Sequence, residues 1–184
     1  FPYVDVLKLP QVIFSGGDLL LNTTQENLIK ELDKYHPSAV IVEAPSNPML
    51  ECVDLIMVSQ LAHARSIPVI VDDTIGSAIN IDVLNHADLI FSSLTKSFAG
   101  RGDILAGSLL VSPKSQWANE LSEVLQKSAL TYLSDADAVA LEETSRDVKK
   151  RIPLLNKACL TLKEKLTHHP SVSKVFHPAE CPNF

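Results

Sequence analysis

The segment FSSLTKSFAGRGD, residues 91–103, places Lys96 after an apolar run and beside the hydroxyl side chains of Ser93 and Thr95. An earlier segment, PVIVDDTIGSA, ends a similar apolar run with Asp72. These groups are the set that pyridoxal phosphate needs: an amine for an imine with the aldehyde, a carboxylate for the pyridine nitrogen, and hydroxyls for the phosphate. A solvated lysine and a turn-forming aspartate fit the spacing as well, so both interpretations are open at this point.

The elements that must position these residues follow from the apolar pattern. Runs of strand length alternate with helix-length amphipathic segments, beginning with the short run 12–14. The runs AVIVEAP, PVIVD and DLIFSS are continuously apolar, which is typical of parallel strands covered on both faces. We therefore predict an α/β fold whose mostly parallel sheet carries helices on both faces. The run ILAGSLLVS follows after only a loop, too short for a parallel crossover, so we expect it to be antiparallel.

Three polar clusters follow the predicted parallel strands: residues 43–48, 72–74 and 92–96. In open parallel sheets, ligands bind at the carboxyl ends of the strands, where the loops diverge. If the strands are neighbours, the three clusters face one cavity. The pattern thus favours a ligand site that contains both Asp72 and Lys96.

The apolar pattern of the sequence changes near residue 113, where long helical patterns begin. One runs over residues 116–127 and another over 136–168, and we expect Pro153 to kink or break the second. The final run SVSKVFHP reads as a strand that opens a new unit. We therefore predict a cofactor-binding large domain over residues 1–130, then a linker helix and the start of a small, truncated α+β domain over 131–184.

Composition excludes several classes of partner. The net charge is −6 and the basic residues are scattered, which argues against a nucleic acid partner. No apolar run reaches the length of a membrane span, so we expect no membrane partner. The three cysteines and six histidines are not arranged at metal-ligand spacing, which predicts no metal site. Free thiols fit a reducing compartment, and we expect a cytoplasmic protein.

The residue sequences of the motifs are more specific than the spacing between the motifs. EAPSNP, VDDT and SSLTKSFAG occur in that order within about fifty residues, and they resemble the E-x-P-x-N-P, V-D-N-T and S-x-T-K patterns of the cysteine and methionine metabolism family of pyridoxal phosphate enzymes. The segments FPYVDVLK, PSNPML and LEETSRDVKKRI extend the likeness to the fungal branch of cystathionine γ-synthases. The chain thus resembles a central fragment of such an enzyme.

The resemblance implies a role for each site residue. Lys96 corresponds to the Schiff-base lysine and Asp72 to the partner of the pyridine nitrogen, with Ser93 and Thr95 as phosphate ligands. Asn47 corresponds to a donor to the phenolic oxygen of the ring, beside which Thr74 is also placed. The resemblance further implies that Glu43 shapes the strand end rather than touching the cofactor.

Two positions depart from the family pattern. Asp73 replaces an asparagine, and we expect it to be an exposed, helix-capping charge. Arg101 lies in AGRGD, where the family has a glycine-rich stretch with a histidine and a serine, and its role is left open.

The resemblance also implies an activity: replacement of the γ substituent of an O-acylhomoserine by a thiol such as cysteine, in a homodimer or homotetramer. A β- or γ-elimination lyase of the same family would use the same lysine and aspartate. A non-catalytic fragment that serves as an interaction module is the alternative from a different class. The ring-stacking tyrosine and the substrate-binding arginine of the family map to no segment of this chain.

Overall fold

The fold is taken from a computed structural model that describes residues 3, 4, 6, 8, 23–128 and 131–183. The predicted strand at residues 12–14 lies outside the described residues. The predicted boundary between residues 130 and 131 also falls at the edge of the described range, and the division into two domains stays a prediction.

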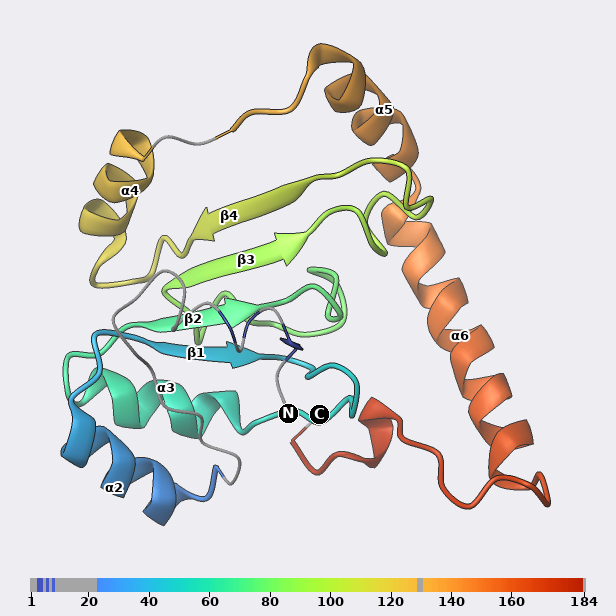
Figure 1. Ribbon diagram of the computed structural model, residues 1–184, viewed down its shortest axis with the longest axis horizontal. Helices are drawn as coiled ribbons and strands as arrows, with labels where there is room; N and C mark the ends of the chain where they lie inside the picture. Colours follow the sequence, from blue (N-terminus) through green and yellow to red (C-terminus); the bar gives the residue numbers. More distant parts are fainter. Residues whose placement is uncertain (1–2, 5, 7, 9–22, 129–130, 184) are drawn as a thin grey trace.

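A four-stranded sheet in the order β1-β2-β3-β4 lies at the centre of Figure 1. β1 (Val40–Glu43), β2 (Val69–Asp72) and β3 (Leu89–Ser93) pair in parallel, and β4 (Gly107–Val111) pairs antiparallel to β3. This is the predicted α/β fold with a mostly parallel sheet flanked by helices. The antiparallel direction of β4 is also confirmed, because the loop from β3 to β4 allows only a direct return.

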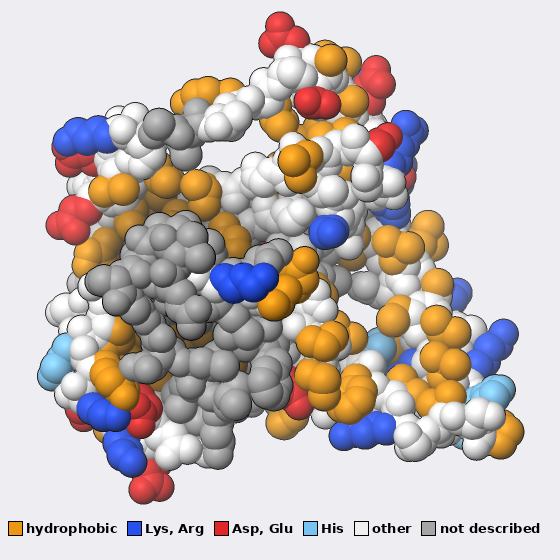
Figure 2. All heavy atoms as spheres, in the orientation of Figure 1, with side chains coloured by type: hydrophobic (Ala, Val, Ile, Leu, Met, Phe, Trp, Pro, Cys, Tyr) orange, Lys and Arg blue, Asp and Glu red, His pale blue; other side chains and the backbone are white. Residues whose placement is uncertain are grey.

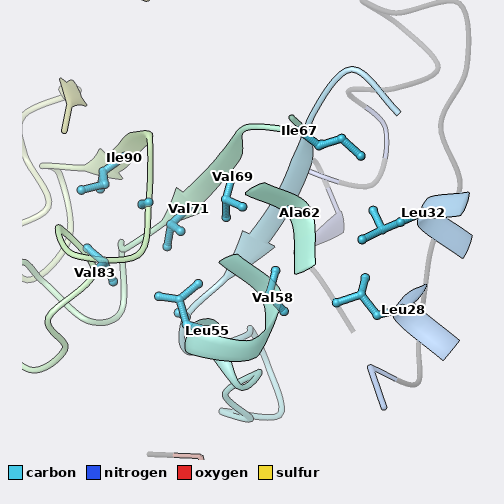
Figure 3. Close-up of a cluster of buried hydrophobic side chains, with 12 residues drawn as sticks. Leu28, Leu32, Leu55, Val58, Ala62, Ile67, Val69, Val71, Val83 and Ile90 are labelled. Atoms are coloured by element: carbon cyan, nitrogen blue, oxygen red, sulfur yellow. The ribbon is translucent and has the colours of Figure 1, made fainter. Parts of the chain in front are cut away.

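Two helices form the main core with the sheet. α3 (Leu55–His63) packs on β2, α2 (Gln25–Tyr35) packs against α3, and the side chains of Ala62, Val69 and Val71 are fully buried (Figure 3). α3 begins at Asp54, whose carboxylate accepts a hydrogen bond from the Met57 amide at 2.9 Å. Each fully buried aliphatic side chain contributes roughly 1.5–3 kcal/mol. This core holds β2, the strand that ends in Asp72.

Asp88 joins three parts of the fold beneath the start of β3. Its carboxylate is buried, accepts hydrogen bonds from the Val69 amide at 2.7 Å and the Ser115 hydroxyl at 2.6 Å, and lies 2.8 Å from Nε2 of His63. A buried carboxylate is tolerated when donors surround it in this way. Asp88 thereby ties α3 and β2 to the segment that follows β4.

The helices after the sheet are α4 (Ala118–Lys127), α5 (Asp135–Ser145) and α6 (Val148–Thr167). The predicted break at Pro153 is wrong: Pro153 lies inside α6, and the helical run is interrupted at residues 146–147 instead. Proline removes one intrahelical hydrogen bond, and α6 continues through this loss. Ile152, which is 2% exposed, is anchored beside the proline.

The predicted strand SVSKVFHP is also wrong. Residues 171–177 are irregular and lead into a short 3-10 helix, Pro178–Glu180. A strand needs a neighbour for its backbone hydrogen bonds, and none pairs with this segment within the described residues. The segment returns to the sheet edge instead, where Asn183 donates to the Cys52 carbonyl at 3.0 Å.

α6 extends away from the sheet, and hydrophobic side chains gather along it in Figure 2. They include Leu154, Leu155 and Leu162, which are 68%, 48% and 55% exposed. Among the described residues, no helix combines the length and the apolar character needed to cross a membrane. The cytoplasmic location stays a prediction.

Candidate active site

The carboxyl ends of the three parallel strands meet at one edge of the sheet. Glu43 at the end of β1 is in register with Asp72 at the end of β2, and Asp72 is in register with Phe91 of β3. The ladder continues past the strands, because the Ala44 amide donates to the Asp72 carbonyl at 3.1 Å and the Asp73 amide donates to the Phe91 carbonyl at 3.0 Å. The three polar clusters of the sequence therefore lie side by side, as predicted.

A short chain of hydrogen bonds connects Asp72 to β3 through Thr74. The Thr74 amide donates to Oδ1 of Asp72 at 2.9 Å, and the Ser93 amide donates to Oγ1 of Thr74 at 2.9 Å. Thr74 thus uses its backbone to orient the Asp72 carboxylate and its side chain to hold the end of β3. The spacing between Asp72 and the segment that leads to Lys96 is fixed by these contacts.

Thr95 and Lys96 follow in the turn after β3. The Thr95 hydroxyl accepts from the Ala106 amide at 3.0 Å and donates to the Ala106 carbonyl at 3.3 Å. Lys96 is exposed, and its carbonyl accepts from the Gly100 amide at 2.8 Å, which closes the turn. The turn therefore offers the lysine side chain to solvent while its backbone is held.

Glu43 organises the loop that contains Asn47. Its carboxylate is 8% exposed and accepts from the Tyr3 amide at 2.5 Å and the Asn47 amide at 3.1 Å. Burial raises the pKa of Glu43, while the two amide donors act in the opposite direction. These contacts agree with the structural role expected for Glu43. Asn47 itself is exposed at the tip of this loop.

Asp73 is not the exposed charge that the sequence suggested. It is 1% exposed because it continues the side of β2 that carries Val69 and Val71, whereas Asp72 alternates to the other side with Ile70. Oδ2 of Asp73 accepts from the Ala78 amide at 2.8 Å, and the buried Oδ1 has no hydrogen-bond partner within the described chain. Two adjacent aspartates thus occupy different environments.

Gly76 leaves the space that the Asp73 carboxylate occupies. A Cβ at residue 76 would lie 1.9 Å from Oδ1 of Asp73 and 3.2 Å from the Ala44 carbonyl oxygen. Burial raises the pKa of Asp73 to about 6, more than its hydrogen bond to the Ala78 amide lowers it, and the charge of Asp72 adds to the rise. The turn after Asp72 therefore covers the carboxyl group of Asp73, whose charged form is disfavoured by burial.

Two arginines near the Lys96 turn differ in their surroundings. Arg101 is exposed in the loop after the turn. Arg151, from the first turns of α6, donates to the carbonyl oxygens of Ser97 at 3.2 Å and Phe98 at 2.7 Å. Sequence reasoning missed Arg151 because 53 residues separate it from Phe98 and no motif joins the two segments.

The donors and acceptors at this edge suit pyridoxal phosphate. Oδ1 of Asp72 takes one amide, and the second carboxylate oxygen can accept from a protonated ring nitrogen. The 3.3 Å contact from the Thr95 hydroxyl to the Ala106 carbonyl is longer than a usual O–H···O bond, so the hydroxyl can turn to a phosphate while the Ala106 amide still donates to it. A lysine, a carboxylate and hydroxyls at the carboxyl edge of a parallel sheet are the groups that a pyridoxal phosphate enzyme of the α/β type requires.

Comparison with known proteins identifies the family. Residues 18–184 match the family described as Cys/Met metabolism PLP-dependent enzyme, and the chain belongs to it. Enzymes of this family depend on pyridoxal 5′-phosphate and act on amino acids.

Individual relatives extend this result. The chain is 32% identical to a cystathionine gamma-synthase of Neurospora crassa and 36% identical to one of Saccharomyces cerevisiae, covering 97% and 96% of this chain but 30% and 28% of the relatives. A solved structure, the cystathione gamma lyase CalE6 of Micromonospora echinospora, matches 89% of this chain and 42% of its own with a TM-score of 0.71 at 26% identity. This chain thus spans less than a third of the two relatives' length.

The burial of Asp73 predicts a pH-dependent stability. Between its ordinary pKa of 3.8 and the folded value of about 6, the folded state binds more protons than the unfolded state. The free energy of unfolding therefore falls as pH rises through that window. Asp73→Asn removes the titrating group, and we expect its melting temperature to fall less from pH 4 to pH 6.5 and to exceed that of the unsubstituted protein at pH 7.

The exposed Asp103 provides the matched control, because Asp103→Asn should leave the wild-type pH dependence intact. Melting curves of the three proteins, recorded by circular dichroism across the window, make the comparison. Parallel pH profiles for Asp73→Asn and the unsubstituted protein would show that Asp73 is not a buried titrating group.

Proposed function

We propose that the enzyme containing this chain uses pyridoxal phosphate to replace the γ substituent of an O-acylhomoserine with a thiol such as cysteine. The observation that carries the proposal is the chain of hydrogen bonds from Asp72 through Thr74 to Ser93, which ends three residues before Lys96. Membership of the family implies that the cofactor is pyridoxal phosphate. The cystathionine gamma-synthases among the relatives support the substrate class.

Each site residue has a part in holding the cofactor. Lys96 would provide the amine that binds the aldehyde, and Asp72 would hold the proton on the pyridine nitrogen through a charge-assisted hydrogen bond. Ser93 and Thr95 would donate to the phosphate. Asn47 and Thr74 would lie beside the ring, where Asn47 would donate to the phenolic oxygen, and the Thr74 amide keeps the Asp72 carboxylate oriented.

The proton transfers follow from these positions. When bound, the cofactor supplies an electron sink for the charge that develops at Cα of the amino acid. Lys96, once free of the cofactor, is the base that removes the Cα proton of the substrate, and its flexible stem on an exposed turn gives it reach. Replacement at the γ carbon also requires loss of a Cβ proton before the γ group leaves. Asp72 would keep the pyridine nitrogen of the cofactor protonated throughout.

An elimination lyase is the second candidate, and the likeness to the cystathione gamma lyase CalE6 favours it. The lysine and the aspartate would do the same work in both reactions. The two reactions would part after the γ group leaves, when either a thiol adds at the γ carbon or water releases an oxo acid and ammonia. The residues that decide this step would control access of the thiol and of water.

The products distinguish the two candidates. With O-acetylhomoserine and cysteine, we expect the full-length enzyme to form cystathionine as the main product, because the thiol of cysteine takes the place of the departing acetate at the γ carbon. Liquid chromatography with mass spectrometry quantifies cystathionine against 2-oxobutyrate. 2-Oxobutyrate as the main product, or release of homocysteine and pyruvate from cystathionine without synthesis of cystathionine, would assign the enzyme to the lyases.

Substitutions test the residue roles in the full-length enzyme. Reduction with borohydride after addition of pyridoxal phosphate should label the peptide that contains Lys96, and Lys96→Ala should abolish this label. Asp72→Ala should keep the label but lose roughly 3 kcal/mol of transition-state stabilisation, about a 100-fold fall in kcat/KM. Asp73→Asn, the adjacent control, should stay within a few-fold of wild type.

Two results would contradict these roles. Equal damage from Asp73→Asn and Asp72→Ala would mean that the wrong carboxylate faces the ring, and the parts given to Thr74 and Asn47 would be withdrawn with it. Absence of label on the Lys96 peptide would favour the alternative of a non-catalytic interaction module.

We also infer a homodimer or homotetramer. The exposed leucines of α6 support this inference, because apolar side chains gathered on one helix are commonly buried by a further domain or subunit. Sedimentation velocity of the full-length enzyme at micromolar concentration should give a species of at least two subunits. A monomer alone would overturn the inference.

A further inference from the structure

The turn that carries Lys96 is held from outside by the guanidinium of Arg151. Arg151 lies near the start of α6, and its Nη2 donates to the carbonyl oxygens of Ser97 at 3.2 Å and Phe98 at 2.7 Å. These are the first and second residues after Lys96. A cation thus binds the backbone of the turn immediately beyond the lysine.

The other side of the same guanidinium is anchored on the helices. Nη1 of Arg151 donates to the Thr144 carbonyl at 3.1 Å and forms an ion pair with the carboxylate of Asp147. The planar guanidinium therefore bridges the junction of α5 and α6 to the Lys96 turn. Lysine could not replace it, because an ammonium is a point charge without the rigid set of donors in one plane.

Gly100 provides the room for this contact. A Cβ at residue 100 would lie 2.8 Å from Cζ and 2.9 Å from Nε of Arg151, and its φ of +77° favours glycine. The Gly100 amide is also the donor to the Lys96 carbonyl, at 2.8 Å. Arg151 therefore lies against the residue that closes the backbone turn of Lys96.

Apolar contacts alone would not fix this turn in one orientation. Ala99, Ile104 and Leu141 form a small buried cluster between the turn and α5. Such contacts are non-directional, whereas hydrogen bonds from a charged donor to two successive carbonyls define both position and rotation. The side chain of Arg151 is 21% exposed, so solvent only partly weakens these bonds.

We propose that Arg151 is a positioning residue that fixes the Lys96 turn before any cofactor binds. The part of this inference that concerns catalysis depends on the proposed function, in which Lys96 binds the cofactor and moves the Cα proton. Pre-ordering the turn lowers the entropy lost when the amine is brought to the reacting atoms. Loss of Arg151 should therefore reduce kcat more than it raises KM.

The test compares Arg151→Met with Arg146→Met in the full-length enzyme. Arg146 is the matched control, because it lies at the same helix junction but its guanidinium binds the carboxylate of Glu142, one helical turn earlier, on the surface. In the cofactor-free enzyme, hydrogen–deuterium exchange of the Gly100 amide should accelerate about tenfold or more in Arg151→Met, as expected for loss of hydrogen bonds to a charged group. Arg146→Met should exchange as the wild type does.

Arg151→Lys and Asp147→Asn extend the test to variants with milder changes. The Gly100 amide in Arg151→Lys should also exchange faster than in the wild type. Asp147→Asn, which removes the charge of the exposed partner of the guanidinium, should give a smaller acceleration at the same amide. With cofactor and substrate, Arg151→Met should lower kcat about tenfold with KM within a few-fold, since only the placement of Lys96 is disturbed.

Unchanged exchange at Gly100 in both Arg151→Met and Arg151→Lys would overturn the inference, as would equal effects from Arg146→Met. If Arg151→Met does not fold, the exchange of Arg151→Lys and Asp147→Asn decides the matter. Exchange is measured without cofactor, so it tests whether Arg151 orders the Lys96 turn even if borohydride leaves the Lys96 peptide unlabelled and the proposed function fails.

Discussion

Parallel pairing of β1, β2 and β3 is the constraint on which the rest of the site depends. The register sets Glu43 beside Asp72 and Asp72 beside Phe91, so that three loops leave the sheet at one edge. A shift of β2 by one residue would exchange the environments of Asp72 and Asp73, because neighbouring side chains on a strand face opposite ways. The buried valines of β2 resist such a shift, since it would move them out of the core.

Contacts outside the sheet then give each loop its shape. Glu43 gathers backbone amides around the first loop, Thr74 joins the second to the third, and Arg151 holds the third from the side of α6. Each of these hydrogen bonds has a backbone group as one partner. The amine of Lys96 and the second oxygen of Asp72 take no part in them, which leaves both groups for chemistry.

Much of this arrangement could be predicted from the sequence, for a physical reason. Continuous apolar runs identify buried parallel strands, and the polar residues that end them identify the edge where ligands bind. The burial of Asp73 escaped prediction because an aspartate after a strand commonly caps a turn, and only the packing around Gly76 shows the space that receives it. The contact of Arg151 with the Lys96 turn escaped as well, because it joins segments distant in sequence. Pro153 led to the prediction of a break that the structure does not contain, because α6 continues through the proline.

The central claim is that this edge of the sheet holds pyridoxal phosphate between Lys96 and Asp72. A crystal structure of the full-length enzyme grown with the cofactor tests it most directly. We predict continuous electron density from Nζ of Lys96 to the cofactor, and a carboxylate oxygen of Asp72 about 3 Å from the pyridine nitrogen. Density joined to another lysine, or a pyridine nitrogen facing Asp73 or Glu43, would contradict the account.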